Sequence, residues 1–184
     1  MDSRYYYKKA IILFYTSCES NNLSLVQKLY IEHRFDASIL DKAFIKCCIN
    51  GCLETAKYLL ENGADVSVHD NYAIKFAITK KDLCMVILTY LYGAHLDPND
   101  YTLIGCAAYN GDLKMAKYLV ACGANIRANN NFAIKIAVKN SHFEVAKYLM
   151  DNGADYQVVR INYFKFCNYL LLNSNDSNKS EIDN

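Results

Sequence analysis

The sequence predicts an all-α fold, a solenoid of short helix-turn-helix units joined by short connecting loops. The main observation is a fixed period, because four Gly-Ala pairs recur every 30 residues and begin at Gly63, Gly93, Gly123 and Gly153. A second observation is that a run rich in Leu or Tyr precedes each pair, as in AKYLLENGAD. Self-similarity at a period of about 20–50 residues is typical of stacked repeats that bury a shared core.

Each unit is predicted to contain two helices, as the unit at residues 133–155 illustrates. A first short helix is indicated by four apolar residues on one helical face, Ala133, Ile134, Ala137 and Val138. The polar residues 140–142 interrupt this pattern, and a second apolar pattern follows over 143–150. Gly153 then stands where a left-handed cap is expected, since glycine has no Cβ. Neither helix is long enough to be stable alone, so neighbouring units must supply the burial.

The period divides the chain into segments. Residues 1–12 are expected to form an N-terminal capping helix, because their apolar run continues in phase into the first unit. Five repeats are expected over 13–160, with approximate bounds 13–42, 43–72, 73–102, 103–132 and 133–160. Residues 161–172 are expected to form a C-terminal capping half-repeat. The tail, 173–184, contains Ile182 as its one apolar residue and is expected to be disordered, because it cannot bury enough apolar surface.

The repeat resembles the ankyrin repeat, most clearly in the fourth unit, which reads TLIGCAAYNGDLKMAKYLVACGAN from Thr102 to Asn125. Other units open with YAIK, FAIK or KAFI in place of the family's T-P-L-H, and the 30-residue period is shorter than the usual period of about 33. Both departures look like the ankyrin arrays of giant DNA viruses. The resemblance implies a protein-binding solenoid, and it leaves open the family's usual hydrogen-bond network between adjacent loops.

Composition and motifs argue against several classes of protein. The chain has 20 Lys and Arg against 19 Asp and Glu, so the clustered positive face of a typical nucleic-acid-binding protein is not expected. No apolar run reaches the length of about 18 residues that a transmembrane helix needs, so no membrane association is expected. The chain lacks a phosphate-binding glycine loop, an HExxH pair and a GxSxG elbow. We therefore expect neither an enzyme nor a cofactor.

The eight cysteines are expected to be free thiols, forming neither disulfides nor a metal site. Cys18 and Cys48 lie one repeat apart, which is roughly 10 Å between backbones and exceeds the limit of about 7 Å for a disulfide. Cys18, Cys47 and Cys48 stand where other units carry Ala, Val or Ile, so they are expected to be small buried apolar residues. Free thiols indicate a reducing compartment. The protein is therefore expected inside the cell, in the host cytoplasm or a viral factory, and not secreted.

The loop tips are one predicted partner-binding surface, because the resemblance implies binding through the tips and the inner face of the first helices. These tips vary between units while the core positions repeat. Variation of this kind is typical of a recognition surface and also of an unconstrained loop, so both interpretations stay open. The candidate tip residues are Ser67, His69, Asp70, Asn99, Asp100, Arg127, Asn129 and Asn130.

Three lysines, Lys75, Lys135 and Lys165, share one position of the repeat. They indicate either a basic ladder that contacts an acidic partner or an ordinary solvated helix face.

The third unit carries a second candidate surface on the outward face of its second helix. Ile87, Leu91 and Tyr92 stand there at positions that are mostly polar in the other full units, and their spacing of i, i+4 and i+5 places them on one helix face. This pattern predicts an exposed apolar patch of the kind that marks a contact site. Local repacking in a degenerate repeat is the alternative. The same unit lacks a glycine at its inter-helix turn, and a weak unit is where a repeat stack uncouples.

The sequence therefore predicts a non-enzymatic protein-interaction module that binds a host or viral protein through concave loop tips, through the third-repeat patch, or through both. A substrate-recruiting adaptor for a host ubiquitin ligase and a self-associating structural repeat protein are the alternatives. The partner is expected to be a protein, and the chain is expected to be a monomer, with self-association left open.

Overall fold

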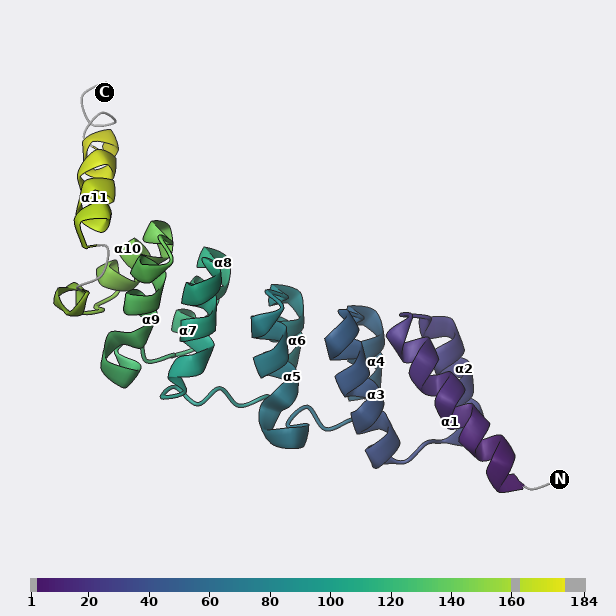
Figure 1. The fold of residues 1–184 in the computed structure, drawn as a ribbon. Coiled ribbons are helices and arrows are strands. Elements are labelled where there is room, and N and C mark those ends of the chain that lie inside the picture. Colours follow the sequence, from purple (N-terminus) through teal and green to yellow (C-terminus); the bar gives the residue numbers. More distant parts are fainter. Residues whose placement is uncertain (1–2, 160–162, 178–184) are drawn as a thin grey trace, which may run out of the picture. The chain divides into compact units, whose positions relative to one another are not determined.

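The computed structural model describes residues 3–159 and 163–177, and these residues form eleven α-helices, one 3-10 helix and no strand (Figure 1). The all-α prediction is therefore confirmed. The chain divides into two compact units, Met1–His95 (unit 1) and Leu96–Asn184 (unit 2), each described by itself below.

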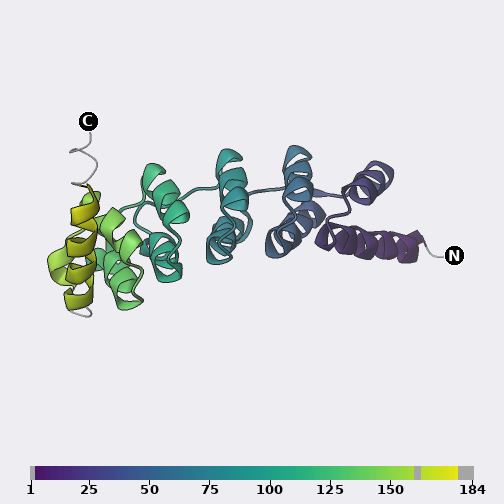
Figure 2. The same ribbon diagram turned by 90° about the horizontal axis from the view of Figure 1, so that it is seen from above.

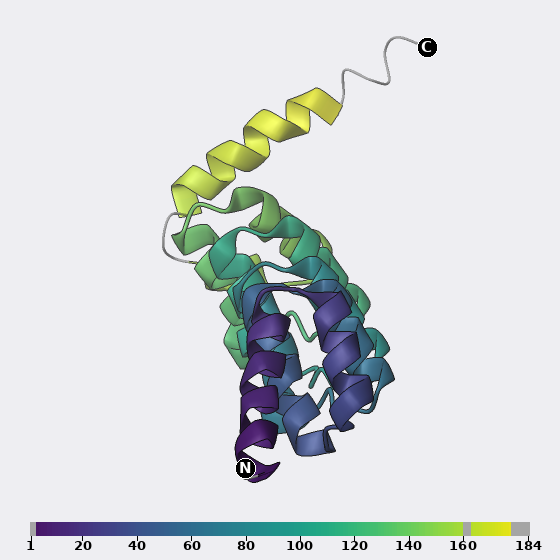
Figure 3. The same cartoon turned by 90° about the vertical axis from the view of Figure 1, so that its right-hand side faces the viewer.

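Unit 1 contains six helices: α1 (Ser3–Glu19), α2 (Leu23–His33), α3 (Ala37–Asn50), α4 (Leu53–Glu61), α5 (Val68–Thr79) and α6 (Leu83–Leu91). Successive helices pack as antiparallel pairs, and Figure 3 shows the first pair, α1 and α2, side by side. The first helices α1, α3 and α5 contact one another in turn, as do the second helices α2, α4 and α6. Unit 1 is therefore a two-layered stack of three helix pairs, visible as successive pairs in Figure 2.

Unit 2 continues the pattern with α7 (Tyr101–Asn110), α8 (Leu113–Ala121), α9 (Ala128–Lys139), α10 (Phe143–Asp151), η1 (Tyr156–Val158) and α11 (Tyr163–Ser177). The second helices of the five repeats begin at Leu23, Leu53, Leu83, Leu113 and Phe143, at intervals of 30 residues as predicted. The Gly-Ala pairs end the second to fifth repeats with the glycines at φ between 92° and 101°, a region open to glycine without strain.

The turn inside each repeat depends on one left-handed residue. Asn21, Gly51, Lys81, Gly111 and Ser141 occupy this position with φ between 55° and 71°. The residue that follows is the N-cap of the second helix, and where it is Asn22, Asp82 or Asp112 its side chain accepts the N–H three residues on. Asn and Asp are favoured caps because a short side-chain oxygen satisfies an orphan amide. Polar residues thus set the helix bounds, and the apolar period sets their packing.

The hydrophobic core runs through the centre of each repeat. At one position of the period the residue is Phe14, Phe44, Ile74, Ile104 or Ile134, and these side chains are 0–1% exposed. Burial of one large apolar side chain stabilises a fold by about 1.5–3 kcal/mol. This position therefore contributes to the stability of every complete repeat.

The N-terminal helix differs from its expected bounds. Residues 3–19 form one continuous helix, α1, so the expected boundary at residue 12 falls inside it. The helix is continuous because the apolar residues Ala10, Phe14 and Cys18 bury along one face on both sides of that boundary. The extra turns at the start therefore belong to the first helix of the first repeat.

The C-terminal half-repeat also differs, because α11 packs through a different face than the other first helices. Phe164 has the position in the period that Phe14 occupies in the core, yet it is 77% exposed. Phe166 is fully buried instead, and the centre of its ring lies 5.9 Å from the centre of the Phe143 ring. The three residues 170–172 are leucines where other repeats have their polar turn, so the helix continues. It reaches Ser177 and so includes the first five residues of the expected tail, 173–177, because helical hydrogen bonds are local and a packed first half can extend. Residues 178–184 lie outside the described residues.

Candidate protein-interaction surfaces

The three residues that the sequence proposes as an apolar contact patch lie on the outward face and at the C-terminal end of α6, and two of them are exposed. Leu91 is 74% exposed, Tyr92 is 37% exposed and Ile87 is half-buried. The opposite face of the helix packs into the core through Met85, Val86 and other buried residues. We call Ile87, Leu91 and Tyr92 the α6 face. The Tyr92 hydroxyl donates to Glu61 Oε1 of α4 at 3.3 Å, so the ring lies toward α4.

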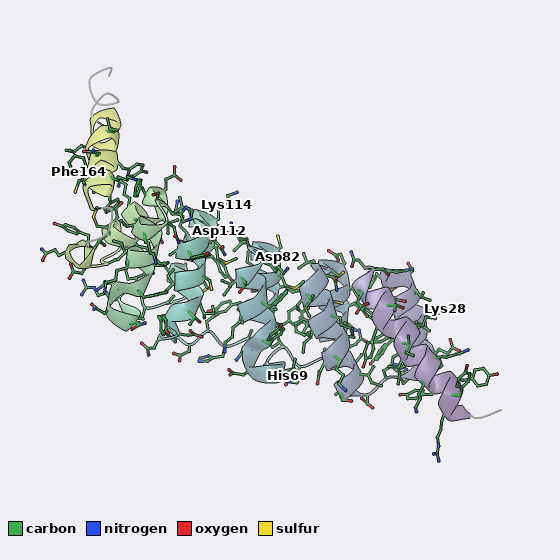
Figure 4. The ribbon with its side chains drawn as sticks, in the orientation of Figure 1. Lys28, His69, Asp82, Asp112, Lys114 and Phe164 are labelled. Carbon is green, nitrogen blue, oxygen red and sulfur yellow. The ribbon has the colours of Figure 1, made fainter. Side chains whose placement is uncertain are left out.

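A second surface lies on the first-helix side of unit 1. A hollow of about 550 Å³ opens there between α1, α3 and the start of α5. Its lining is Tyr15 from α1, then Lys42, Ile45, Lys46 and Ile49 from α3, and His69 and Tyr72 from α5. We call this hollow the unit 1 groove. Among the candidate residues chosen from the sequence only His69, marked in Figure 4, lines it.

Contacts around the unit 1 groove hold its walls in place. Lys46 Nζ forms an ion pair with Glu19 Oε1 at 2.5 Å and lies 5.6 Å from the centre of the Tyr15 ring. The Tyr72 ring stacks on Phe76 with a centroid separation of 5.7 Å. On α3, the side chains of Ile45 and Ile49 face the same hollow one turn apart. The groove therefore has apolar walls with amines at its rim.

The loop tips beside these helices adopt an uncommon backbone conformation. His69, Asp70 and Asn71 have φ of 52°, 58° and 56°, and residues 129–131, all asparagine, have φ between 47° and 57°. Asn and Asp tolerate this left-handed region better than other residues with a Cβ. Three successive left-handed residues reverse the chain just before the right-handed part of α5 and α9 begins.

A repeated side-chain bond fixes these loops. Asn71 Oδ1 accepts the N–H of His95 at 3.0 Å, and Asn131 Oδ1 accepts the N–H of Asp155 at 2.9 Å. In the second repeat the same position is Asp41, whose Oδ1 accepts the N–H of a residue 24 positions on at 2.7 Å. Each bond joins the start of a first helix to the loop that ends the same repeat.

The fourth repeat uses a different bond at the same place, because its residue is Tyr101, which offers no such acceptor. There the N–H of Asn125 donates to the Pro98 carbonyl at 2.8 Å, and Asn125 Nδ2 donates to Asn99 Oδ1 at 3.2 Å. The loops of this chain are thus tied by Asx side chains and main-chain groups, without the T-P-L-H residues.

Comparison with known proteins agrees with this architecture. A family model described as ankyrin repeats (3 copies) matches residues 72–160, and one described as ankyrin repeat matches residues 43–71, together more than half of the chain. The chain belongs to the ankyrin repeat family. Ankyrin repeats generally mediate protein–protein interactions.

A solved structure gives the same fold. The crystal structure of the human ASB11 ankyrin repeat domain matches with a TM-score of 0.64 and 21% sequence identity, over 77% of this chain and 69% of that chain. At this identity the likeness concerns the fold alone. No curated protein sequence matches the chain. These comparisons confirm the ankyrin resemblance, and none of them points to a viral origin.

Most of the candidate tip residues in these ankyrin repeats have side chains that are engaged by other groups of the protein. Ser67 Oγ donates to Asp65 Oδ1, and Arg127 Nε donates to the Gly153 carbonyl at 2.6 Å. Asp100 Oδ1 accepts the N–H of Thr102 and so caps α7. His69, Asn129 and Asn130 are exposed. The side chains of most tip residues therefore hold the loops in their conformation. His69 is the candidate tip residue that lines a hollow.

The three lysines that share one position of the period differ in their surroundings. Lys75 pairs with Asp70 Oδ2 at 2.9 Å, and this hydrogen-bonded cation lowers the pKa of the Asp70 carboxyl. Lys135 is half-buried and Lys165 is exposed. The two interpretations of these lysines thus stay open.

The cysteines occupy the places expected from the repeat. Cys18, Cys47 and Cys48 are free and buried, as predicted, and Cys47 Sγ lies 3.7 Å from the Cys18 carbonyl oxygen. A hydrogen bond with Cys18 and burial both raise the pKa of Cys47, and burial raises the pKa of Cys48 to about 12. These groups are therefore protonated thiols that pack as small apolar side chains. Cys84, in contrast, is exposed.

Two further findings concern the part of the chain that the structure describes. Within it, no three His, Cys, Asp or Glu side chains are grouped so that they could hold a metal ion. None of its helices combines the length and the apolar character needed to cross a bilayer.

Proposed function

We propose that this ankyrin repeat protein is a non-enzymatic interaction module that binds a partner protein at the unit 1 groove. The observation that carries the proposal is a hollow of about 550 Å³ with exposed apolar walls, where Ile49 is 43% and Tyr72 is 41% exposed. Binding sites are typically concave, largely apolar and equipped with a few polar groups, and this hollow has that composition. The tip residue His69 extends the surface to the loop.

The α6 face is the second surface in the proposal. Leu91 is the most exposed apolar side chain of unit 1 among those described. Apolar side chains that gather on one exposed helix face mark contact sites in soluble proteins. The α6 face thus supplies either an additional contact for the same partner or the site of self-association.

Affinity capture with two variants, one in the groove and one in the patch, tests the proposal. The groove variant is Ile49→Asp/Tyr72→Asp. The patch variant is Ile87→Lys/Leu91→Glu/Tyr92→Asn, which gives α6 the residues found at the same positions of α4, namely Lys57, Glu61 and Asn62. Circular dichroism first establishes that each variant is folded. A partner retained by the wild type and the patch variant but lost by the groove variant supports the proposal. A partner lost only by the patch variant moves the site to α6.

The adaptor role, self-association, the source of the partner and the location of the protein are further proposals from the sequence. A ubiquitin-ligase adaptor would capture ligase subunits together with its target, and a self-associating protein would show a dimer or larger species by light scattering that the patch variant abolishes. A partner from a host or a virus, and a location in host cytoplasm or a viral factory, are supported by the viral-type repeat openings and by the free buried thiols.

A further inference from the structure

We propose that the unit 1 groove takes an acidic peptide segment of its protein partner, with an apolar side chain in the hollow and carboxylates on the amines at its rim. This inference rests on the proposed function at the same groove and adds the chemistry of the ligand.

The apolar part of the groove is specific to the second repeat. Ile45 has Lys75, Gly105, Lys135 and Lys165 at its position in later repeats. Ile49 corresponds to Glu19, Thr79 and Lys139 in three other repeats and to Tyr109 and Tyr169 in the remaining two. Two branched apolar side chains, one turn apart on α3 and flanked by tyrosine rings, therefore occur here at positions that are mostly polar or charged elsewhere. A volume of about 550 Å³ accommodates one or two large apolar side chains.

The charge at the rim has one sign. Lys42, Lys46 and His69 line the groove, and among the described residues no carboxylate lines it. Of the neighbouring carboxylates, Glu19 pairs with Lys46 and so neutralises one of the two rim lysines, and Asp70 pairs with Lys75 outside the groove.

Lys42 is the cation most available to a ligand. It is exposed and forms no ion pair among the described residues. The nearby carboxylate of Asp36 already accepts hydrogen bonds from Ser38 and the Ile39 N–H at the start of α3, which lower its pKa, and the charge of Lys42 adds a smaller effect. A ligand carboxylate therefore finds an unpaired lysine beside an apolar hollow.

A hollow in unit 2 provides a contrast. It measures about 390 Å³, and its lining includes Lys117 and Glu144 as well as Lys147 and Asp151, which pair with each other at 2.7 Å. Charges of both signs line that hollow, so it offers no preference for an acidic ligand. The electrostatic selectivity is a property of the unit 1 groove.

Fluorescence anisotropy with three labelled peptides tests the ligand chemistry. The probe has a central Leu-Phe pair between two runs of Glu and Asp. One control peptide replaces the acids by Lys, and the other replaces Leu-Phe by Ser-Ser. The probe is expected to bind at least about tenfold more tightly than either control, because each control removes one of the two contacts. Its affinity is expected to fall as salt rises, because exposed ion pairs are screened.

Variants of the protein locate the site. Ile49→Ser and Lys42→Glu are each expected to weaken the probe about tenfold or more, while Ile31→Ser and Lys28→Glu, exposed residues of the same types on α2, leave it unchanged. The proposal of an acidic ligand is overturned by any of three results: equal binding of the acidic and basic peptides, equal loss of affinity in both pairs of variants, or no binding of the probe. If the probe fails while the groove variant still loses a captured partner, the proposed function stands and only the ligand chemistry is wrong.

Discussion

Replacing Asn131 by Ala tests how the loops of this array are held. Asn131 is 8% exposed and has φ of 57°, and its Oδ1 accepts the N–H of Asp155 at 2.9 Å. The side chain therefore has two effects: it tolerates the left-handed backbone at the start of α9, and it ties this turn to the loop after α10. Alanine removes both.

The expected destabilisation follows from these two effects. Loss of a partly buried hydrogen bond costs about 0.5–1.5 kcal/mol in the free energy of unfolding. Alanine in a left-handed conformation costs about 1–2 kcal/mol, of which asparagine already incurs a part, so the difference is about 0.5–1 kcal/mol. The Asn131→Ala variant is therefore expected to be about 1–2.5 kcal/mol less stable, with a Tm lower by roughly 3–8 °C for a chain of this size.

Two further substitutions at this position separate the effects. Asn131→Gly removes the acceptor but also relieves the strain of the left-handed backbone. The decrease in its free energy of unfolding therefore reports the hydrogen bond alone, about 1 kcal/mol. Asn131→Asp keeps an acceptor and is expected to stay close to the wild type, because Asp41 makes the equivalent bond in the second repeat.

Guanidinium chloride unfolding followed by circular dichroism measures the order of stability, which is expected to be Asp, then Gly, then Ala. An alanine variant as stable as the aspartate variant would refute the reasoning. A glycine variant less stable than the alanine variant would show that the left-handed backbone is not a cost at this position.

Four further predictions use other features of the chain. Ser141→Gly is expected to raise stability by about 0.5–1 kcal/mol in the same unfolding assay, because Ser141 has φ of 62° and glycine removes the left-handed strain; a less stable variant would contradict this. Gly105→Ala is expected to lower stability by about 1 kcal/mol, although alanine usually favours a helix, because its Cβ would lie 2.7 Å from Phe132 Cε1; a gain would show that the ring moves aside freely. A thiol reagent such as DTNB is expected to label Cys84 of the native protein first, since Cys84 is exposed and four other cysteines are buried; a Cys84→Ser variant that keeps the fast phase would refute this. Hydrogen bonds from Ser38 and the Ile39 N–H lower the pKa of Asp36, so its contribution to stability is present above the unfolded pKa and is lost as pH falls through the lower folded value. Acid unfolding should therefore reduce the stability difference between wild type and Asp36→Ala from roughly pH 5 downward, and a difference that does not depend on pH would contradict the assignment.

The repeat period could be predicted from the sequence because it depends on residues that act locally. Glycine at Gly63 and its equivalents ends a helix through its own backbone freedom, and the apolar spacing of one helix shows which face is buried. For the same reason the starts of all five second helices agree with the period. The exposure of Leu91 on α6 also followed, because comparison with polar residues at equivalent positions indicates the outward face.

The departures from expectation arise where packing outweighs the period. The period assigns Phe164 to the core, but in the structure Phe166 is buried instead. Among the described residues no second helix follows α11 to cover the ordinary core face, and α11 contacts α10 through the rings of Phe166 and Tyr169 against Phe143. Local patterns do not determine this choice, since both faces of the helix are apolar.

The unit 1 groove could not be found from one repeat at a time. Its walls combine Tyr15, Ile49 and Tyr72, which lie on three different helices and are each only partly exposed. Considered singly, these residues resemble the scattered apolar side chains of any soluble surface, which need no functional explanation. Their significance depends on α1, α3 and α5 lying side by side, because only this packing places Ile45 and Ile49 between two tyrosine rings and beside Lys42. Comparison of equivalent positions across repeats, which indicates the α6 face, also distinguishes Ile45 and Ile49, since lysines and other polar residues occupy most of those positions elsewhere. The signal was therefore present in the period, but on the first helix instead of the second.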